Sequence, residues 1–263
     1  MMEFEIFVCD AFTTQRFRGN SAAVIPVNDW LSDELMLSIA AENNLSETAF
    51  IKPIDLDHYE IRWFSPLCEV DFCGHATLAS AYVLFTHFDA GERITFETRL
   101  MGPITVDKDL SGRILMTFPH KKPQAIEPPA ELLEGLSIPP VEILRNPQAY
   151  FAVYENEQDI LNLTTKSEYL KLLAPYDVVA TAKGDEYDFV SRYFWPANGG
   201  DEDPVTGSIH AGLAPFWCER LKKTHLKAFQ ASRRGGTIYC HVEPEQVVVS
   251  GDVVPYSHGK IYV

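Results

Sequence analysis

Three ionisable side chains stand in sequence contexts that suit proton transfer, namely Glu47, His75 and Asp203. Glu47 precedes an apolar run, and a carboxylate buried without a partner can act as acid and base near neutral pH. A neutral imidazole at His75 could accept or relay a proton. Asp203 follows Asp201 and Glu202, whose charges favour its protonated form. The alternatives are a capping or surface glutamate, a structural histidine and a solvated acidic loop.

Two predicted helix starts supply backbone N–H groups that could bind a small anion. Residues 74–77 and 206–208 each lie where a strand-like segment gives way to an apolar, helical one. The first N–H groups of a helix lack partners within it, and the positive end of the helix dipole favours a negative ligand. We therefore expect a substrate carboxylate to contact Gly74, Ala76, Thr206, Gly207 and Ser208, and the substrate also to contact Ser46, which precedes Glu47. Alternatively, Asp203, Thr206 and Ser208 only cap a helix.

The two helix starts belong to an internal repeat with a constant offset of 130 residues (192 − 62). Arg62-Trp63-Phe64-Ser65-Pro66 aligns with Arg192-Tyr193-Phe194-Trp195-Pro196, and the same register places Cys73 opposite Asp203. A repeat with different ionisable residues at matching positions predicts two folded halves that close on one site and divide its chemistry.

The elements that must position these residues are strands and two nearly all-apolar helices. In the first half we expect strands over residues 4–12, 22–27, 48–51, 59–64, 93–97, 102–107 and 113–118, and helices over 32–43 and 76–85. In the second half we expect strands over 143–154, 177–182, 187–194, 246–250 and 260–263, and helices over 165–173 and 208–221. A helix that is hydrophobic all round needs cover on every side, so each half should wrap a sheet around its helix. The Pro-rich stretch at 119–140 separates halves at 1–118 and 119–257, and a last strand over 258–263 can pair with the first half.

The composition is that of a globular protein with an acidic excess. The 263 residues are 46% hydrophobic, and 37 acidic against 22 basic residues give a formal charge of −15. Because a sequence-independent grip on phosphate backbones needs clustered Lys and Arg, we expect no nucleic-acid partner. We find no secretory signal and no membrane-spanning stretch, so we expect no membrane contact and a cytoplasmic location. Five cysteines without a staple-like pattern predict reduced thiols.

Other chemistries find weaker support in the sequence. Metal ligands could come from Cys68, Cys73, His75, Cys240 and His241. No paired C-x-x-C motif occurs, so we expect no metal ion. The glycine pairs are isolated and form neither a G-x-G-x-x-G motif nor a P-loop, so we expect no nucleotide cofactor. A Ser, His and Asp triad could be built from Ser46 or Ser208, but the absence of a G-x-S-x-G motif makes hydrolysis a weak alternative.

Seven short segments run in one order over nearly the whole chain. They are Val8-Cys9-Asp10-Ala11-Phe12, Arg18-Gly19-Asn20-Ser21-Ala22-Ala23-Val24, Asn44-Leu45-Ser46-Glu47-Thr48, Arg62-Trp63-Phe64-Ser65-Pro66, Cys73-Gly74-His75-Ala76-Thr77, Glu202-Asp203-Pro204-Val205-Thr206-Gly207-Ser208 and Val249-Ser250-Gly251. Together they resemble the phenazine biosynthesis PhzF-like family, a branch of the diaminopimelate epimerase fold. The resemblance implies an α+β fold of two pseudo-symmetric halves, each a barrel-like, mostly antiparallel sheet around a central helix. It also implies an active site in the cleft between the halves and a homodimer.

The resemblance further implies roles for four residues. The family's acid/base glutamate falls on Glu47, and its site histidine, aspartate and serine fall on His75, Asp203 and Ser208. The family reaction is a cofactor-free isomerisation of a cyclic dihydro-hydroxyanthranilate, in which a proton leaves one ring carbon and returns at another. By analogy, Glu47 shuttles the proton and His75 and Asp203 support it. Ser208 and the helix-start amides then hold the substrate carboxylate.

Two residues depart from the phenazine-making pattern. One is Cys73, which precedes Gly74, and the other is Ser21, where that pattern usually has proline. In the epimerase branch each helix start carries a cysteine, and the pair works as two bases. Here Asp203 stands at the second place, and Cys218 follows 15 residues later (218 − 203), which disfavours two-cysteine epimerisation. Three hypotheses follow: a cofactor-independent isomerase of a small carboxylate-bearing metabolite, an epimerase or racemase that uses the Cys73 thiol, and a non-catalytic binding protein.

Overall fold

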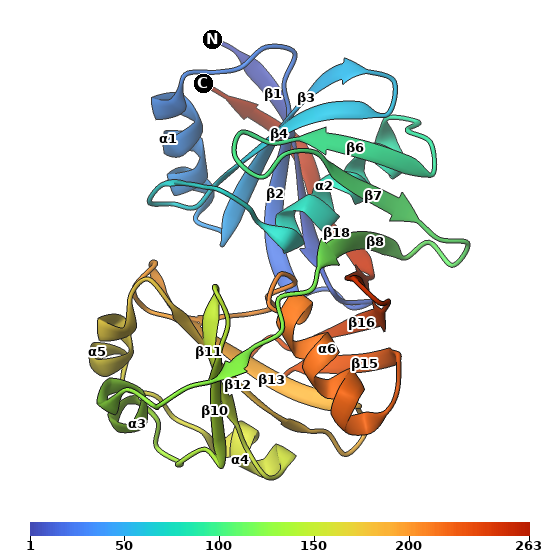
Figure 1. The fold of residues 1–263 in the computed structure, drawn as a ribbon. Helices are drawn as coiled ribbons and strands as arrows, with labels where there is room; N and C mark the ends of the chain where they lie inside the picture. The colour runs from blue at the N-terminus through green and yellow to red at the C-terminus, as the bar shows by residue number, and fades with distance from the viewer. The chain divides into compact units, whose positions relative to one another are not determined.

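The computed structural model describes all residues, 1–263, and divides them into two compact units. Unit 1 contains residues 1–117 and 250–263, and unit 2 contains residues 118–249. The expected second half ended at residue 257, but the chain returns to unit 1 earlier because its last strand, β18 (Val253–Tyr262), is longer than expected. This strand pairs antiparallel with β1 (Glu3–Ala11), so the two ends of the chain lie side by side (Figure 1).

Unit 1 is built on a mixed sheet. Its other strands are β2 (Asn20–Pro26), β3 (Glu47–Asp55), β4 (His58–Phe64), β5 (Glu69–Val70), β6 (Arg93–Glu97), β7 (Ile104–Lys108) and β8 (Ile114–Pro119). The pairs β2–β3 and β4–β6 are parallel, whereas β1–β2, β3–β4, β4–β5, β6–β7 and β7–β8 are antiparallel. Because a parallel pair needs a crossover, a helix connects the strands of each parallel pair.

These two crossover helices have different environments. The first, α1 (Asp33–Asn43), starts where Ser32 Oγ accepts a hydrogen bond from the Leu35 backbone N–H, as its N-cap position predicts. The second, α2 (Gly74–His87), has ten of its 14 residues buried, which confirms the predicted core helix. A helix that is apolar on nearly every side is stable only when other elements cover it, and β1, β2, β3 and β18 contact α2.

Unit 2 repeats this plan. Its strands are β9 (Gln124–Ala125), β10 (Glu142–Arg145), β11 (Ala149–Val153), β12 (Asp177–Lys183), β13 (Phe189–Trp195), β14 (Gly200–Asp203), β15 (His225–Gln230), β16 (Gly236–Val242) and β17 (Gln246–Gly251). The pairs β11–β12 and β13–β15 are parallel, at the places where unit 1 has β2–β3 and β4–β6. The predicted repeat is therefore a repeat of strand pairing.

An ion pair marks the same place in both units. Arg62 on β4 donates Nε and Nη2 to the two carboxylate oxygens of Glu69 on β5, each at 2.7 Å. Arg192 on β13 bonds both carboxylate oxygens of Glu202 on β14 in the same way, at 2.8 and 3.0 Å. Each bidentate pair ties a short, polar strand to a long one, and each short strand leads toward a core helix.

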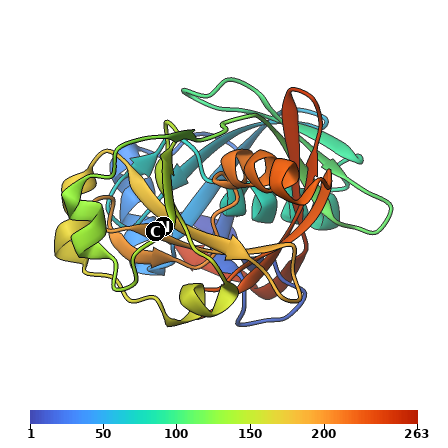
Figure 2. The ribbon, with the colours of Figure 1, turned by 60° about the horizontal axis from the view of Figure 1, so that its bottom comes forward.

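The core helix of unit 2 is α6 (His210–Leu221), and four short helices complete the unit. They are α3 (Ala130–Gly135), α4 (Glu157–Asn162), α5 (Ser167–Leu170) and the 3₁₀ helix η1 (Lys171–Leu173). Within this unit, Figures 1 and 2 show α6, in orange, on the opposite side of the strands from α3 and α5. The short helices cover a second apolar cluster that includes Leu132, Ile160 and Leu170.

Several expected elements differ from those in the structure. The helix expected from Ser208 begins at His210, because Gly207 to Ile209 form a turn in which the N–H of His210 bonds Gly207 O and that of Ala211 bonds Ser208 O. Strands β15 and β16 were not assigned from the sequence, although their burial alternates with the period of two that a half-buried strand shows. With these corrections, the predicted α+β class is confirmed.

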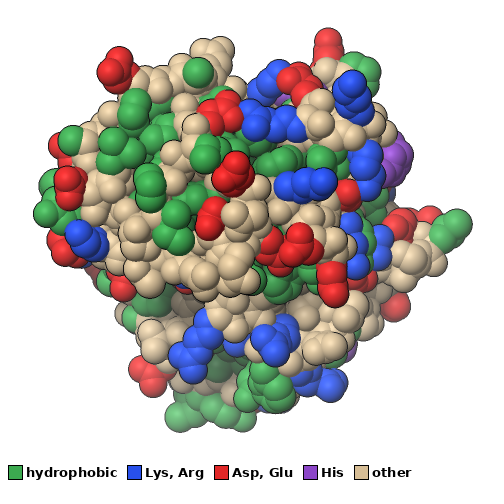
Figure 3. Space-filling model, turned by 90° about the horizontal axis from the view of Figure 1, so that it is seen from below, with side chains coloured by type: hydrophobic (Ala, Val, Ile, Leu, Met, Phe, Trp, Pro, Cys, Tyr) green, Lys and Arg blue, Asp and Glu red, His purple; other side chains and the backbone are tan.

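Acidic and basic side chains lie interspersed on the face of the molecule seen in Figure 3, and the basic ones do not form one continuous patch there. No helix in the structure combines the length and the apolar character needed to cross a bilayer.

A substitution at Gly212 on α6 tests how closely the rest of unit 2 packs against this helix. A Cβ atom at this position would lie 2.8 Å from Asn146 Nδ2, from the Lys121 carbonyl oxygen and from Phe151 Cζ. Although alanine is the better helix former, this overlap should make Gly212→Ala less stable by about 1–3 kcal/mol in urea unfolding. Gly259→Ala is the control, since nothing lies within 4 Å of its Cβ position. A stabilised Gly212→Ala protein would contradict the close approach.

Candidate active site

Unit 1 brings Glu47, Cys73 and His75 together. Glu47 is the first residue of β3 and pairs with Ala22 on β2, while Cys73 is the N-cap of α2 and His75 lies in its first turn. His75 Nε2 lies 3.1 Å from Glu47 Oε2, and His75 Nδ1 lies 3.4 Å from Cys73 Sγ. The exposed fractions are only 7% for Glu47, 7% for Cys73 and 4% for His75. Three groups able to exchange protons therefore share one buried place.

The imidazole of His75 is oriented by a short chain of hydrogen bonds. Ser46 Oγ donates to Asn20 Oδ1 at 3.0 Å, which turns the Asn20 amide nitrogen toward His75 Nδ1, 3.1 Å away. Since an amide nitrogen can only donate, Nδ1 is the acceptor and the ring proton belongs on Nε2, which faces Glu47. This assignment rests on the amide orientation that Ser46 sets.

Glu47 Oε2 meets His75 without a well-aligned hydrogen bond. Oε2 lies 3.1 Å from Nε2, yet it is buried and has no hydrogen-bond partner in the structure. A buried carboxylate oxygen without a partner is costly, typically by about 1–3 kcal/mol, unless it takes up a proton or binds another group. Glu47 therefore has the environment expected of a group that accepts and returns a proton.

The start of α2 supports part of the predicted anion site. Gly74 and Ala76 belong to its first turn, where N–H groups have no acceptor within the helix. The Thr77 N–H already bonds Cys73 O, as does the Thr77 hydroxyl. The amides of Gly74 and Ala76 therefore remain the candidates for contact with a substrate.

Unit 2 brings Asp203 and Thr206 together, but in a different arrangement. The Thr206 hydroxyl donates to Asp203 Oδ2, and the Thr206 N–H donates to Gln230 Oε1 at 2.9 Å. Gln230 Nε2 in turn donates to Asp203 O at 2.8 Å. The expectation that the Thr206 amide lies at a helix start is wrong, because that amide precedes the helix and donates to Gln230. Contact between Thr206 and a substrate stays a prediction. Gly207 contributes its carbonyl to the following turn.

Ser208 belongs to a second polar network, which the sequence analysis missed. Gln148 Nε2 donates to Ser208 Oγ at 2.9 Å and to the Tyr193 hydroxyl at 3.1 Å, and Tyr193 donates to Asp177 Oδ2 at 2.6 Å. Burial raises the pKa of the Asp177 carboxyl, and burial followed by the Asp177 charge raises the pKa of Tyr193 well above its ordinary value. The segment Arg145-Asn146-Pro147-Gln148-Ala149 loosely resembles Gly19-Asn20-Ser21-Ala22-Ala23, and this likeness was the signal in the sequence that could have pointed to Gln148.

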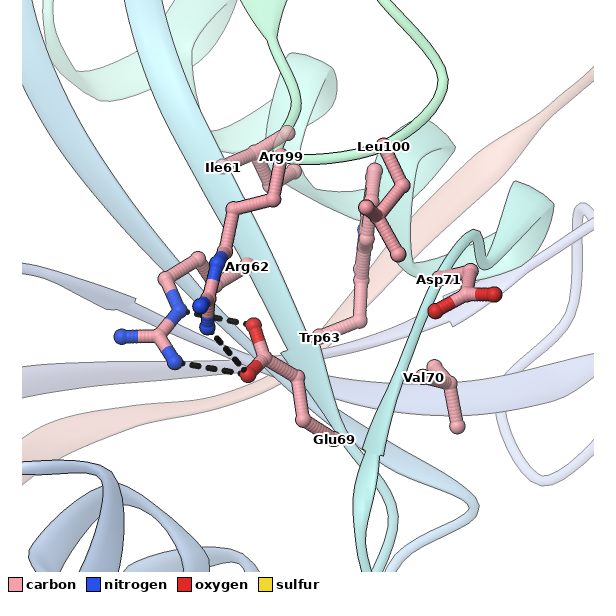
Figure 4. Close-up of a pocket in the computed structure, with 8 residues that line it drawn as sticks. All are labelled: Ile61, Arg62, Trp63, Glu69, Val70, Asp71, Arg99 and Leu100. Atoms are coloured by element: carbon pink, nitrogen blue, oxygen red, sulfur yellow. Dashed lines mark hydrogen bonds and ion pairs between the residues drawn. The ribbon is translucent and has the colours of Figure 1, made fainter.

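A separate hollow of about 250 Å³ lies in unit 1, lined by residues of β4, β5 and the segment after β6 (Figure 4). Arg62 and Arg99 both bond Glu69 there, as the dashed lines show. Its lining includes neither Glu47 nor Cys73 nor His75, so it is distinct from the cluster. Since its arginines are already paired, this hollow is less suited to hold an anion.

Comparisons with known proteins agree with this fold. A model of the PhzC-PhzF family, described as phenazine biosynthesis-like protein, matches residues 9–259. An uncharacterised isomerase of Pseudomonas aeruginosa is 45% identical over the full length of both chains. The crystal structure of a PhzF-family phenazine biosynthesis protein from Enterococcus faecalis superposes with a TM-score of 0.94 at 39% identity, covering 100% of both chains. A probable proline racemase from Agrobacterium radiobacter shares the fold, with a TM-score of 0.65 at 10% identity over 99% of this chain and 93% of that one.

The fold and the relatives define an isomerase-type enzyme. The chain belongs to the PhzC-PhzF family of phenazine biosynthesis-like proteins, which confirms the family that the seven segments predicted.

The tautomer of His75 can be tested through Asn20. In the wild type, nitrogen-15 NMR of the histidine side chains should show the His75 proton on Nε2, because the Asn20 amide donates to Nδ1. In Asn20→Asp, the carboxylate can only accept, so a proton should appear on Nδ1. An unchanged protonation pattern in Asn20→Asp would show that Asn20 does not set the tautomer.

His210 in unit 2 predicts a pH dependence of stability. Complete burial lowers its pKa from 6.5 to about 4, although its Nδ1 donates to Thr206 O. Between pH 6.5 and 4 the unfolded chain binds a proton that the folded chain does not, so stability should fall as the pH falls. The share of His210 is on the order of 3 kcal/mol over this window.

The matched variant is His210→Asn, which keeps a donor near the Nδ1 position but cannot titrate. Its free energy of unfolding should be lower at neutral pH, because a buried side chain is shortened, but should decline less steeply toward pH 4. Equal slopes for the two proteins in denaturant unfolding would contradict the lowered pKa.

Proposed function

We propose that the protein is a cofactor-independent isomerase that moves a proton between two carbons of a small carboxylate-bearing metabolite, of which a cyclic dihydro-hydroxyanthranilate is the model. The observation that carries this proposal is the buried approach of His75 Nε2 to Glu47 Oε2 at 3.1 Å. It supplies a carboxylate that can take up a proton and a neighbour that can stabilise its charge.

In the proposed reaction, the Glu47 carboxylate removes a proton from a carbon of the substrate and becomes a carboxylic acid. The electron pair of the broken C–H bond shifts along the conjugated system of the substrate. Glu47 then returns the proton to a different carbon, so that the enzyme ends in its starting state. The Nε2–H of His75 lies 3.1 Å from Glu47 Oε2 and favours the charged form of Glu47 before and after the transfer through its dipole, although the two are not aligned as a hydrogen bond in the structure.

We further propose that each unit supplies residues to the reaction. The two units repeat one strand topology, and each carries its ionisable residues near the start of its core helix. We assign Asp203 to support the proton transfer and the Ser208 hydroxyl, with the amides of Gly74 and Ala76, to hold the substrate carboxylate. Gln148 fixes the direction of the Ser208 hydroxyl because its amide nitrogen donates to Ser208 Oγ.

A second candidate function uses the Cys73 thiol. Cys73 Sγ lies 3.4 Å from His75 Nδ1, a separation that allows a thiol and an imidazole to share a proton. Such a thiol, at the start of a helix, could act as the base of an epimerase or racemase. By contrast, the burial of Glu47 disfavours a purely non-catalytic binding protein, because such a protein has no need of a buried carboxylate beside a histidine.

Deuterium incorporation from heavy water tests the role of Glu47. Candidate small acids, including a cyclic dihydro-hydroxyanthranilate, are incubated with wild-type protein, and the acid that exchanges is then used for the variants. Glu47→Gln should exchange at least about 100-fold more slowly, since general acid–base groups contribute roughly 10²–10⁴-fold. Glu42→Gln, an exposed glutamate at the end of α1, is the matched control and should be unaffected. Equal exchange by wild type and Glu47→Gln would remove the assignment.

The same assay separates the two candidates. Cys73→Ser should keep its exchange rate within a few-fold if Glu47 is the only base. A loss as large as that of Glu47→Gln, together with inversion at a stereocentre by the wild type, would favour the thiol-dependent epimerase. Asp203→Asn tests the contribution of unit 2 and should slow the exchange as well.

A further inference from the structure

We propose that Glu47, Cys73 and His75 form a binding site for a single soft divalent cation, Zn²⁺, and that the bound metal inhibits the enzyme. The sequence predicted no metal, because it contains no paired C-x-x-C motif. The structure brings the three donor types together from two separate segments, β3 and the start of α2. The inhibition by the bound metal is the only part of this proposal that rests on the proposed function. The binding itself rests on the donor atoms.

The donor atoms have suitable spacing. Glu47, Cys73 and His75 each offer one ligand atom, and these atoms all lie within 4.8 Å of one another. His75 Nε2 is 3.1 Å from Glu47 Oε2 and 4.0 Å from Cys73 Sγ. Zinc bonds of roughly 2.0–2.3 Å place tetrahedral ligands about 3.3–3.7 Å apart. The Nε2–Oε2 and Nε2–Sγ pairs need shifts of only a few tenths of an ångström, and the widest pair of donor atoms needs at most about 1 Å, to enclose the ion.

The chemistry of the three groups also suits zinc. A thiolate, an imidazole and a carboxylate are all common zinc ligands, whereas a hard cation such as Mg²⁺ prefers oxygen alone. The thiolate and the carboxylate together carry two negative charges, which a divalent cation neutralises. Glu47 Oε2 is buried and has no hydrogen-bond partner, and a metal would satisfy it.

A supporting residue is already in place. Metal-bound histidines usually donate their other ring N–H to an oxygen that fixes the ring. When His75 Nε2 binds the metal, its Nδ1 carries the ring proton. The Asn20 amide nitrogen now lies 3.1 Å from Nδ1. A flip of that amide would place Asn20 Oδ1 there instead, as an acceptor for the Nδ1 proton. Ser46 can follow this flip, because a hydroxyl both donates and accepts.

Inhibition follows from shared atoms. The oxygen that the metal occupies belongs to the carboxylate that we assign to proton transfer. A metal-bound carboxylate is a poor base, so zinc and catalysis exclude one another. Zinc should therefore reduce deuterium exchange by the wild type, and a chelator should restore it.

Titration with Co²⁺, a spectroscopic substitute for Zn²⁺, tests the site. The wild-type protein should bind one Co²⁺ per chain and show both a near-ultraviolet thiolate-to-cobalt band and strong visible bands of a tetrahedral ion. Added Zn²⁺ should displace Co²⁺ and remove the bands. Cys73→Ser should lose the thiolate band and bind Zn²⁺ at least about tenfold more weakly, since even residues that only support a ligand contribute 10–100-fold. Weak octahedral bands in the wild type would overturn the proposal.

Control variants make the test specific. Cys68→Ser and Cys218→Ser remove the two thiols that are not buried and should leave the spectrum unchanged. Circular dichroism of Cys73→Ser should match that of the wild type, which separates loss of a ligand from loss of the fold. A thiolate band that persists in Cys73→Ser would also overturn the site.

The metal site and the proposed function can fail independently. If Glu47→Gln exchanges deuterium normally but weakens Co²⁺ binding, the catalytic role of Glu47 fails and the metal site stands. If Co²⁺ does not bind but Glu47→Gln loses exchange, the metal site fails and the isomerase stands.

Discussion

The contact between Glu47 and His75 is the interaction on which the site depends. At 3.1 Å and almost fully buried, it joins a carboxylate to an imidazole without aligning them as a simple hydrogen bond. A fully aligned and saturated pair would be stable but inert, whereas an oxygen that keeps an unsatisfied lone pair can still take up a proton. The fold tolerates this arrangement because the groups around it are closely held.

Two segments far apart in the sequence hold that contact. Glu47 is fixed by the parallel pairing of β2 and β3, and His75 is fixed in the first turn of a helix that the sheet surrounds. Asn20, which begins β2, lies with its amide nitrogen 3.1 Å from His75 Nδ1. The orientation of one imidazole is thus determined by a strand, a helix and a loop serine.

The two units use one topology for different tasks. Their parallel pairs and their bidentate arginine–glutamate pairs correspond, yet the residues near the core helices do not. In unit 1 the helix begins directly at the cluster, and its first amides lie beside ionisable groups. In unit 2 a turn precedes α6, and Gln230 takes up the Thr206 amide. A duplicated scaffold therefore permits asymmetric chemistry, since loops between conserved strands can change without disturbing the sheet.

The sequence by itself determined the family, the α+β class and the two buried helices, because periodicity and short motifs depend on nearby residues. It also predicted Glu47, His75 and Asp203 as site residues, with Cys73 as a further thiol, and the structure brings Glu47, Cys73 and His75 together. The helix start at His210 was misplaced, since the side chains of Asp203 and Gln230 pin the preceding loop and only one of them is close in sequence. Asn20 and Gln148 received no role for the same reason: each acts on a residue 55 or 60 positions away. Tertiary structure alone decides such partners, because a hydrogen bond depends on distance in space and not along the chain.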